Sequence, residues 1–223
     1  MIPWIELGRA RAPGGEELRL IRRGREFAIM LGQNPLMNSR LTGSEEALAS
    51  LAFEALPGRA KPRVLIGGLG MGFTLRAALK VFAEDAMIEV AELVPAVVAW
   101  ARSEMAEIFE GCLEDARVRI HTGDIGARMA SEKSGWDAIL LDVDNGPEGL
   151  TRQANDGLYS MRGLANARAA LRPGGALLVW SQGPDEMFTR RFGKAGFAVE
   201  ARTIRSGRNG KGARHTIWVG LKG

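Results

Sequence analysis

Three glycines follow a short apolar run in the segment Val64-Leu-Ile-Gly-Gly-Leu-Gly-Met-Gly72. Gly68, Gly70 and Gly72 have the spacing G-x-G-x-G, and such a turn between a strand and a helix lets the backbone approach a ligand closely. Glu92 closes a second apolar run 24 residues after Gly68. A carboxylate at the end of that strand can bind both hydroxyls of a ribose. The pattern predicts a nucleoside-binding site.

The glycine spacing also limits the kind of ligand. A dinucleotide fingerprint has the form G-x-G-x-x-G/A, and counting from Gly68 its last position is Phe73. A phosphate-binding P-loop requires Gly-Lys-Ser/Thr, whereas Gly72 is followed by Phe73-Thr74. Without a pyrophosphate motif, the pattern favours a nucleoside that has no phosphate, such as S-adenosylmethionine or a relative. The alternative is a glycine-rich turn that binds no ligand.

More acidic residues follow the next predicted strands. Asp124 follows the third strand, and Asp142 and Asp144 follow the fourth. Asp124 could accept a hydrogen bond from the 6-amino group of an adenine, or it could be the N-cap of a helix over residues 125–130. Asp144-Asn-Gly could equally be a simple turn. Acids at consecutive strand ends nevertheless favour a shared ligand site.

Strands and helices alternate from residue 61 onward, which predicts an α/β fold with a doubly wound, mainly parallel seven-stranded sheet. The last two strands have no helix between them and should form an antiparallel hairpin. Ligands of such sheets bind beyond the carboxyl ends of the strands. The expected strands are 63–68, 87–92, 117–121, 136–142, 176–181, 197–204 and 216–221, and the expected helices are 73–83, 95–109, 156–171 and 184–195.

The first forty residues have a different pattern. Residues 17–23 and 25–31 alternate or run apolar around Gly24, which predicts a small β-hairpin appendage, and Gly32-Gln-Asn-Pro35 is a turn signal. A helix is expected over residues 44–56, with Ser44 as its N-cap and acids in its first turn. We therefore expect a hairpin region over residues 1–42 and an α/β domain over residues 43–223.

The composition, with 46% hydrophobic and 25% charged residues, is that of an ordinary globular protein. No signal peptide or membrane span is expected. The single cysteine, Cys112, fits a reducing cytoplasm, and with only His121 and His215 beside it no metal site is expected. The charge is +4, and basic residues gather over 202–214. No aromatic residues are interleaved there, which argues against a nucleic-acid partner.

The motifs together resemble the spermidine synthases (polyamine aminopropyltransferases) within the class I methyltransferase fold, from about residue 17 to residue 221. The resemblance includes the N-terminal hairpin and the glycine loop followed by Thr74-Leu-Arg76. It continues through Ala91-Glu-Leu-Val-Pro-Ala-Val-Val98, Gly123-Asp124, the loop Asp142–Pro147, Leu158-Tyr159 and Ser181-Gln182. It implies a methyltransferase-like Rossmann fold and a small-molecule amine acceptor.

The resemblance also implies roles for individual residues. Glu92 would hold the ribose, Asp124 would face the adenine, and Gln33 would contact the donor. Asp142 would help to deprotonate the attacking amine, which as an ammonium ion is no nucleophile, and Asp144 would orient that amine. The exposed face of the hairpin could support a homodimer.

The chain also departs from the family pattern. Met71 stands where the glycine loop usually has an aspartate that binds the donor's aminopropyl ammonium group. Ser44-Glu-Glu-Ala replaces a Tyr-His-Glu triplet, and residues around Gly163-Leu164 replace a Phe-Tyr pair. Three hypotheses follow. The first is aminopropyl transfer from decarboxylated S-adenosylmethionine, the second is methyl transfer from S-adenosylmethionine, and the third is a nucleoside-binding homologue without turnover.

Overall fold

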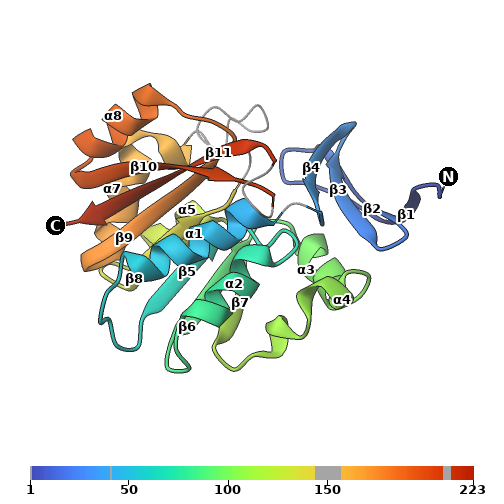
Figure 1. Cartoon of the computed structure of the whole chain (residues 1–223), viewed down its shortest axis with the longest axis horizontal. Coiled ribbons are helices and arrows are strands. Elements are labelled where there is room, and N and C mark those ends of the chain that lie inside the picture. Colours follow the sequence, from blue (N-terminus) through green and yellow to red (C-terminus); the bar gives the residue numbers. More distant parts are fainter. Residues whose placement is uncertain (1, 41, 144–156, 208–211) are drawn as a thin grey trace.

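The computed structural model describes residues 2–40, 42–143, 157–207 and 212–223. Within these ranges the main sheet has seven strands in the order β10-β11-β9-β8-β5-β6-β7. Strands β5 to β9 run parallel, and β11 pairs antiparallel with β9 and with β10 (Figure 1). The strands are β5 Arg63–Gly67, β6 Met87–Glu92, β7 Val118–Thr122, β8 Trp136–Leu141, β9 Leu171–Ser181, β10 Phe197–Arg205 and β11 Arg214–Lys222. The predicted doubly wound sheet with its terminal hairpin is confirmed.

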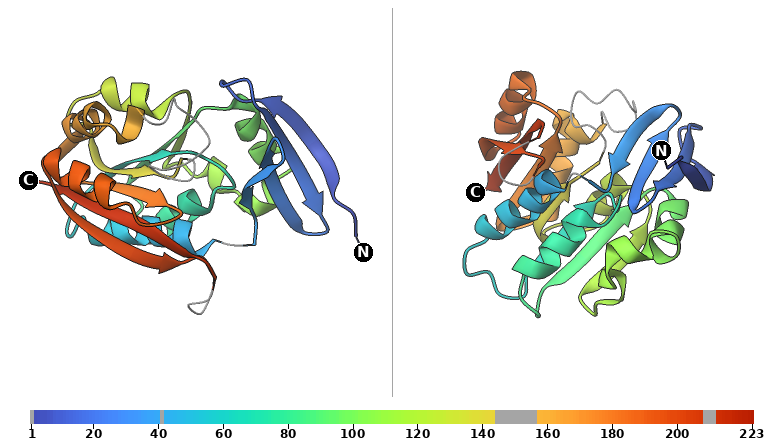
Figure 2. Two further views of the ribbon diagram at one scale, coloured as in Figure 1. Left: turned by 90° about the horizontal axis from the view of Figure 1, so that it is seen from above. Right: turned by 45° about the vertical axis from the view of Figure 1, so that its right-hand side comes forward.

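Helices cover both faces of this sheet. On one face α1 (Gly43–Glu54) packs against α2 (Phe73–Val81), with α3 (Pro95–Arg102) beyond them. On the other face α5 (Ile125–Ala130) packs against α7 (Met161–Ala170), and α8 (Glu186–Lys194) lies next to α7 (Figures 1 and 2). The predicted helix over 95–109 is divided into α3 and α4 (Ala106–Phe109). The one-turn helix η1 (Cys112–Glu114) follows it. The backbone leaves the helical region at Ser103.

The central strands are apolar throughout because both of their faces are covered. On β5, Val64 and Ile66 join the core on the α1 face, and Leu65 joins the core on the α5 face. This alternation, which follows from the two-residue period of a strand, continues on β8 and β9. It places Trp180, near the end of β9, on the α1 face. The sheet is therefore held rigidly between two cores, and its carboxyl-end loops start from fixed positions.

The N-terminal region forms a second sheet. The predicted hairpin is present as β2 (Glu17–Arg23) and β3 (Glu26–Leu31), and in the described residues it is extended by β1 (Ile5–Arg11) and β4 (Asn34–Asn38) to the order β1-β2-β3-β4. The sheet stands beyond the carboxyl ends of the parallel strands (Figure 2). A side chain at Gly8 would collide with the indole of Trp100 on α3, so glycine is needed where the sheet meets α3. The domain boundary expected near residue 42 stays a prediction.

No helix in the described ranges is long and apolar enough to cross a membrane.

Candidate active site

A cavity of about 490 Å³ lies between the carboxyl ends of the parallel strands and the N-terminal sheet. Residues of β2, β3 and β4, including Leu18, Ile29 and Met37, form its apolar wall. The loops that follow β5, β6, β7 and β8 form the opposite side. Five of the predicted site residues line this cavity, namely Gly68, Gly70, Glu92, Asp124 and Asp142. The predicted residues at the carboxyl ends of the parallel strands therefore lie around one cavity, as expected for a sheet of this kind.

The carboxylate of Glu92 is held by the backbone. The N–H of Leu69 donates to Oε2 at 2.8 Å, and the N–H of Val94 donates to Oε1 at 2.8 Å. These bonds join the glycine loop after β5 to the loop after β6, and they fix the position of a carboxylate that is only 7% exposed. A fixed carboxylate on the cavity wall suits a pair of vicinal hydroxyl groups, because both hydroxyls can donate to it.

Asp124 combines the two alternatives that its sequence context left open. It is the N-cap of α5, with Oδ1 accepting from the N–H of Ala127 at 2.7 Å, and it also lines the cavity. The cap bond uses one lone pair and fixes the side chain. The remaining acceptor capacity of the carboxylate is available to a donor group such as the amino group of adenine.

The glycine loop passes close to two neighbouring segments. Gly68 has φ +89°, and a Cβ there would collide with the backbone oxygen of Asp142. Gly70 has φ +48°, and a Cβ there would lie 2.8 Å from Sδ of Met37 on the N-terminal sheet. Both positions therefore need glycine for close packing around the cavity. Gly72 is the N-cap of α2 and packs against Phe109; it is not among the described residues that line the cavity.

Asp142 occupies an unusual environment for a carboxylate. The hydroxyl of Thr74 donates to its Oδ2 at 2.6 Å. Burial first, and then the charge of the neighbouring Glu45, raise the pKa of Asp142 to about 7, although the bond from Thr74 acts in the opposite direction. A carboxyl group with a pKa near neutrality is well matched to accept a proton at physiological pH.

Three further residues of this region were not identified as site residues from the sequence. Glu45, Trp180 and His215 all line the cavity, and Trp180 Nε1 is buried without a hydrogen-bond acceptor in the described residues. Ser44-Glu45 has the sequence pattern of an ordinary helix start, and the predicted N-cap is wrong. The N-cap is Thr42, and the hydroxyl of Ser44 bonds instead to Glu45 and His215.

Gln33 and Asp144 were also predicted to belong to the site. Gln33 is exposed in the turn between β3 and β4, and it is not among the described cavity-lining residues. Asp144 lies outside the described residues, so its predicted role stays a prediction. Met71 is fully buried in the core of the α1 face.

The charge of the cavity wall is one-sided. Among the described residues it carries four carboxyl side chains and no lysine or arginine; the acids are Glu45, Glu92, Asp124 and Asp142. The cavity therefore favours a cationic ligand over an anionic one. No group of three or more metal-ligating side chains occurs in the described part of the chain.

The chain is similar in sequence to curated polyamine aminopropyltransferases. It is 29% identical over 138 residues to the enzyme of Mycobacterium tuberculosis (strain ATCC 25618 / H37Rv), which covers 60% of this chain and 25% of that relative. It is 31% identical over 122 residues to the enzyme of Nitrosomonas europaea, which covers 55% of this chain and 36% of that relative. The matched region is thus about a quarter to a third of the length of these relatives. No family model matches the chain.

The chain is also similar in fold to solved structures of spermidine synthases. Spermidine synthase from Thermotoga maritima superposes with a TM-score of 0.78 at 18% identity, covering 98% of this chain and 73% of that one. This chain has the fold of spermidine synthase. A spermidine synthase in complex with the transition-state analogue AdoDATO superposes with a TM-score of 0.76 at 18% identity, covering 98% and 72% of the two chains. At 18% identity, these two structural matches establish the fold of this chain and nothing beyond it.

Proposed function

We propose that this protein is a transferase that moves an aminopropyl group from decarboxylated S-adenosylmethionine to a small-molecule amine. The observation that carries the proposal is the acidic cavity wall, with four carboxyl groups and no lysine or arginine among the described residues. The decarboxylated donor is a dication, with a sulfonium and an ammonium group. S-adenosylmethionine has an additional carboxylate, for which these described residues offer no cationic side chain. The names of the curated relatives support the same reaction.

In the proposed reaction, Glu92 binds the ribose hydroxyls and Asp124 accepts from the adenine amino group. The nitrogen of the amine attacks the CH₂ carbon of the aminopropyl group that is bonded to the sulfonium, so that a C–N bond forms as that C–S bond breaks. The electron pair of the C–S bond stays on sulfur, and methylthioadenosine leaves. Ionised Asp142 takes the proton of the attacking amine. The cavity contributes mainly by placing nitrogen, carbon and sulfur in line.

A second candidate is methyl transfer from S-adenosylmethionine on the same scaffold. Met71 favours it, because this buried side chain leaves the glycine loop without a carboxylate for the donor's ammonium group. The two candidates share the nucleoside half of the site, with Glu92 and Asp124. They differ in the charge of the group attached to sulfur.

Calorimetric titration with decarboxylated S-adenosylmethionine, S-adenosylmethionine and methylthioadenosine separates these candidates. Tighter binding of the decarboxylated donor, followed by release of methylthioadenosine on addition of a diamine, is the expected result. Tighter binding of S-adenosylmethionine would instead support methyl transfer. If none of the three binds, the proposed transferase function is wrong.

A further inference from the structure

The first turn of α1 brings a second carboxyl group to the position of Asp142. Glu45 lines the same cavity, and Thr74 connects the two residues. Its hydroxyl lies 2.6 Å from Oδ2 of Asp142 and 3.4 Å from the main-chain oxygen of Glu45. Two carboxyl groups that share a partly dehydrated site cannot both ionise freely, because each charge opposes the other.

A chain of hydrogen bonds from β11 holds the side chain of Glu45. The hydroxyl of Ser44 donates to Oε2 of Glu45 at 2.7 Å, and Nδ1 of His215 lies 2.9 Å from the same hydroxyl oxygen. Because a hydroxyl has only one proton to donate, Nδ1 of His215 must carry a proton and donate it to Ser44. The ring of His215 meets Trp180 edge-on, with ring centroids 4.8 Å apart. Residues on β9 and β11 thus position a carboxylate on α1.

The surroundings decide which of the two acids carries a proton. The pKa of Glu45 is raised, mainly by burial and least by the charge of Glu46, but the bond from Ser44 and a backbone hydrogen bond act against this rise. Asp142 accepts only from Thr74 in the described residues, and its pKa is raised to about 7 by burial and by Glu45. Because the hydroxyl of Ser44 donates to Glu45, the arrangement favours ionised Glu45, with the proton of the pair on Asp142 below about pH 7. The other titratable groups on the described cavity wall are Glu92, Asp124 and His215, and burial lowers the pKa of His215.

We propose that Glu45 and Asp142 act as one acidic pair, which holds a single proton in the empty site and exchanges it for an alkylammonium group of the ligand. Ser44 and His215 are positioning residues for this pair. The exchange breaks no C–H or N–H bond: the ammonium group enters with its three protons, and the proton of Asp142 leaves to the solvent. The identity of the ligand rests on the proposed function, but the existence of the pair does not.

Proton release on binding is the direct test. Calorimetric titrations at pH 6.5 in two buffers with different heats of ionisation give the number of protons released per ligand. Decarboxylated S-adenosylmethionine alone, and 1,4-diaminobutane added to the methylthioadenosine complex, each present an ammonium group; methylthioadenosine alone has none. We expect release approaching one proton for whichever ammonium enters the pair, no release for methylthioadenosine, and a decline towards zero above pH 8.5. The two ammonium ligands show whether the donor or the acceptor supplies the group.

Variants make the test specific. Glu45→Gln removes the neighbouring charge, so Asp142 ionises at lower pH and release at pH 6.5 falls to less than half. Ser44→Ala removes the donor that favours ionised Glu45, so the release curve should move to higher pH instead. Glu46→Gln is the matched control, because Glu46 lies in the same turn but is exposed, accepts from Thr42, and has the smallest of the effects on the pKa of Glu45. Equal release in the wild type and in Glu45→Gln would overturn the pair.

A second measurement needs no ligand. Infrared difference spectra between the wild type and Asp142→Asn isolate the carbonyl band of the protonated Asp142 carboxyl group. We expect this band to disappear around pH 7 in the wild type and at clearly lower pH in Glu45→Gln. An unchanged midpoint would overturn the pair, whether or not the protein is a transferase. Binding of both the decarboxylated donor and 1,4-diaminobutane without proton release would likewise overturn the pair and leave the transferase proposal standing.

Discussion

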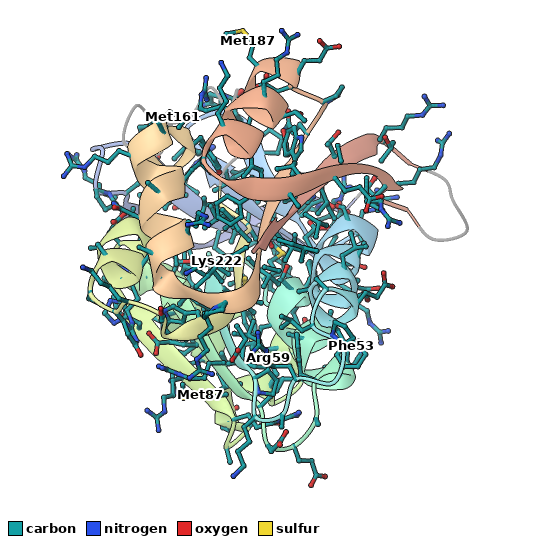
Figure 3. All side chains as sticks on the ribbon, turned by 90° about the vertical axis from the view of Figure 1, so that its left-hand side faces the viewer. Phe53, Arg59, Met87, Met161, Met187 and Lys222 are labelled. Atoms are coloured by element: carbon teal, nitrogen blue, oxygen red, sulfur yellow. The ribbon has the colours of Figure 1, made fainter. Side chains whose placement is uncertain are left out.

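Strand β8 has an aspartate near each end, and the two residues have opposite surroundings. Asp137, near the amino end, is fully buried and has two arginines beside it: Arg59 Nε is 3.3 Å from Oδ1, and Arg172 donates to Oδ2 at 2.8 Å. The N–H of Arg63 also donates to Oδ2 at 2.8 Å. Asp142, just beyond the carboxyl end, has instead the hydroxyl of Thr74 and the charge of Glu45. Arg59 lies on the side of the molecule that faces away from the N-terminal sheet (Figure 3).

The difference separates a structural acid from a reactive one. The arginines around Asp137 compensate its charge, so this acid joins β8 to the segments of Arg59 and Arg172. Asp142 lacks such compensation in the described residues, which is unfavourable for the empty protein but favourable for a cationic ligand. Sites that bind or react commonly carry a cost in stability of this kind.

The largest effect is expected from Asp142→Asn on turnover. An amide cannot accept the proton of the attacking amine, so kcat for aminopropyl transfer should fall by about 10²–10⁴-fold. The affinity for methylthioadenosine should be unchanged, because Glu92 and Asp124 remain in place. Single-turnover kinetics and calorimetry measure the two quantities. Normal turnover of this variant would remove Asp142 from the role of base.

The matching change at the other end, Asp137→Asn, should act on folding. It leaves Arg59 and Arg172 without their partner charge, and loss of one member of a buried ion pair costs about 3–5 kcal/mol. Both arginines are about one-third exposed, at 33% and 35%, and can regain water, so we expect the lower end, about 3 kcal/mol. Urea unfolding measures this free energy. If kcat of the folded variant fell as far as in Asp142→Asn, the distinction between the two aspartates would be wrong.

The two aspartates should also differ in the pH dependence of stability. The pKa of Asp142 is raised to about 7 in the folded protein, against about 3.9 in an unfolded chain. From about pH 4 to pH 7 the folded state therefore holds a proton that the unfolded state has lost, so its stabilising contribution decreases by about 1.4 kcal/mol per pH unit. Asp142→Asn removes this slope and should stabilise the empty protein more at pH 8 than at pH 5, as urea unfolding at both pH values would show. A pH-independent effect would contradict the raised pKa.

The sequence predicts the part of the site that depends on one parallel sheet. Glu92 ends β6, and Asp124 and Asp142 come shortly after β7 and β8. The carboxyl ends of these parallel strands meet at one edge of the sheet. Glu45 and His215 depend on how α1 and β11 pack against that edge, which no local pattern encodes. Ser44 and His215 are hydrogen-bonded across 171 positions of the chain, and the expected N-cap role of Ser44 concealed this contact.

The N-terminal sheet shows a similar limit. The hairpin of β2 and β3 has the expected alternation, but β1 is interrupted by Gly8 and β4 contains Pro35. Glycine weakens a strand pattern, and proline is confined to edges and bulges. Both strands lie at the edges of the four-stranded order in the described residues, where such residues are tolerated because an edge strand has ladder hydrogen bonds on one side only.

The smallest of these effects is expected from Glu92→Gln, which tests the nucleoside half of the site against its reactive half. The amide keeps one acceptor oxygen but loses the charge that strengthens hydrogen bonds from ribose hydroxyls. A hydrogen bond to a charged group contributes about 1.5–3 kcal/mol, so Kd for methylthioadenosine should rise by about 10- to 100-fold. The backbone N–H groups of Leu69 and Val94 would then share one oxygen, and a small loss of stability should accompany the change.

At saturating donor, kcat should stay within a few-fold of the wild type, because the distance of Asp142 from the reacting nitrogen does not depend on Glu92. Unchanged affinity for methylthioadenosine would remove Glu92 from the site, whereas a loss of kcat as large as that of Asp142→Asn would show that the two halves of the cavity do not act separately.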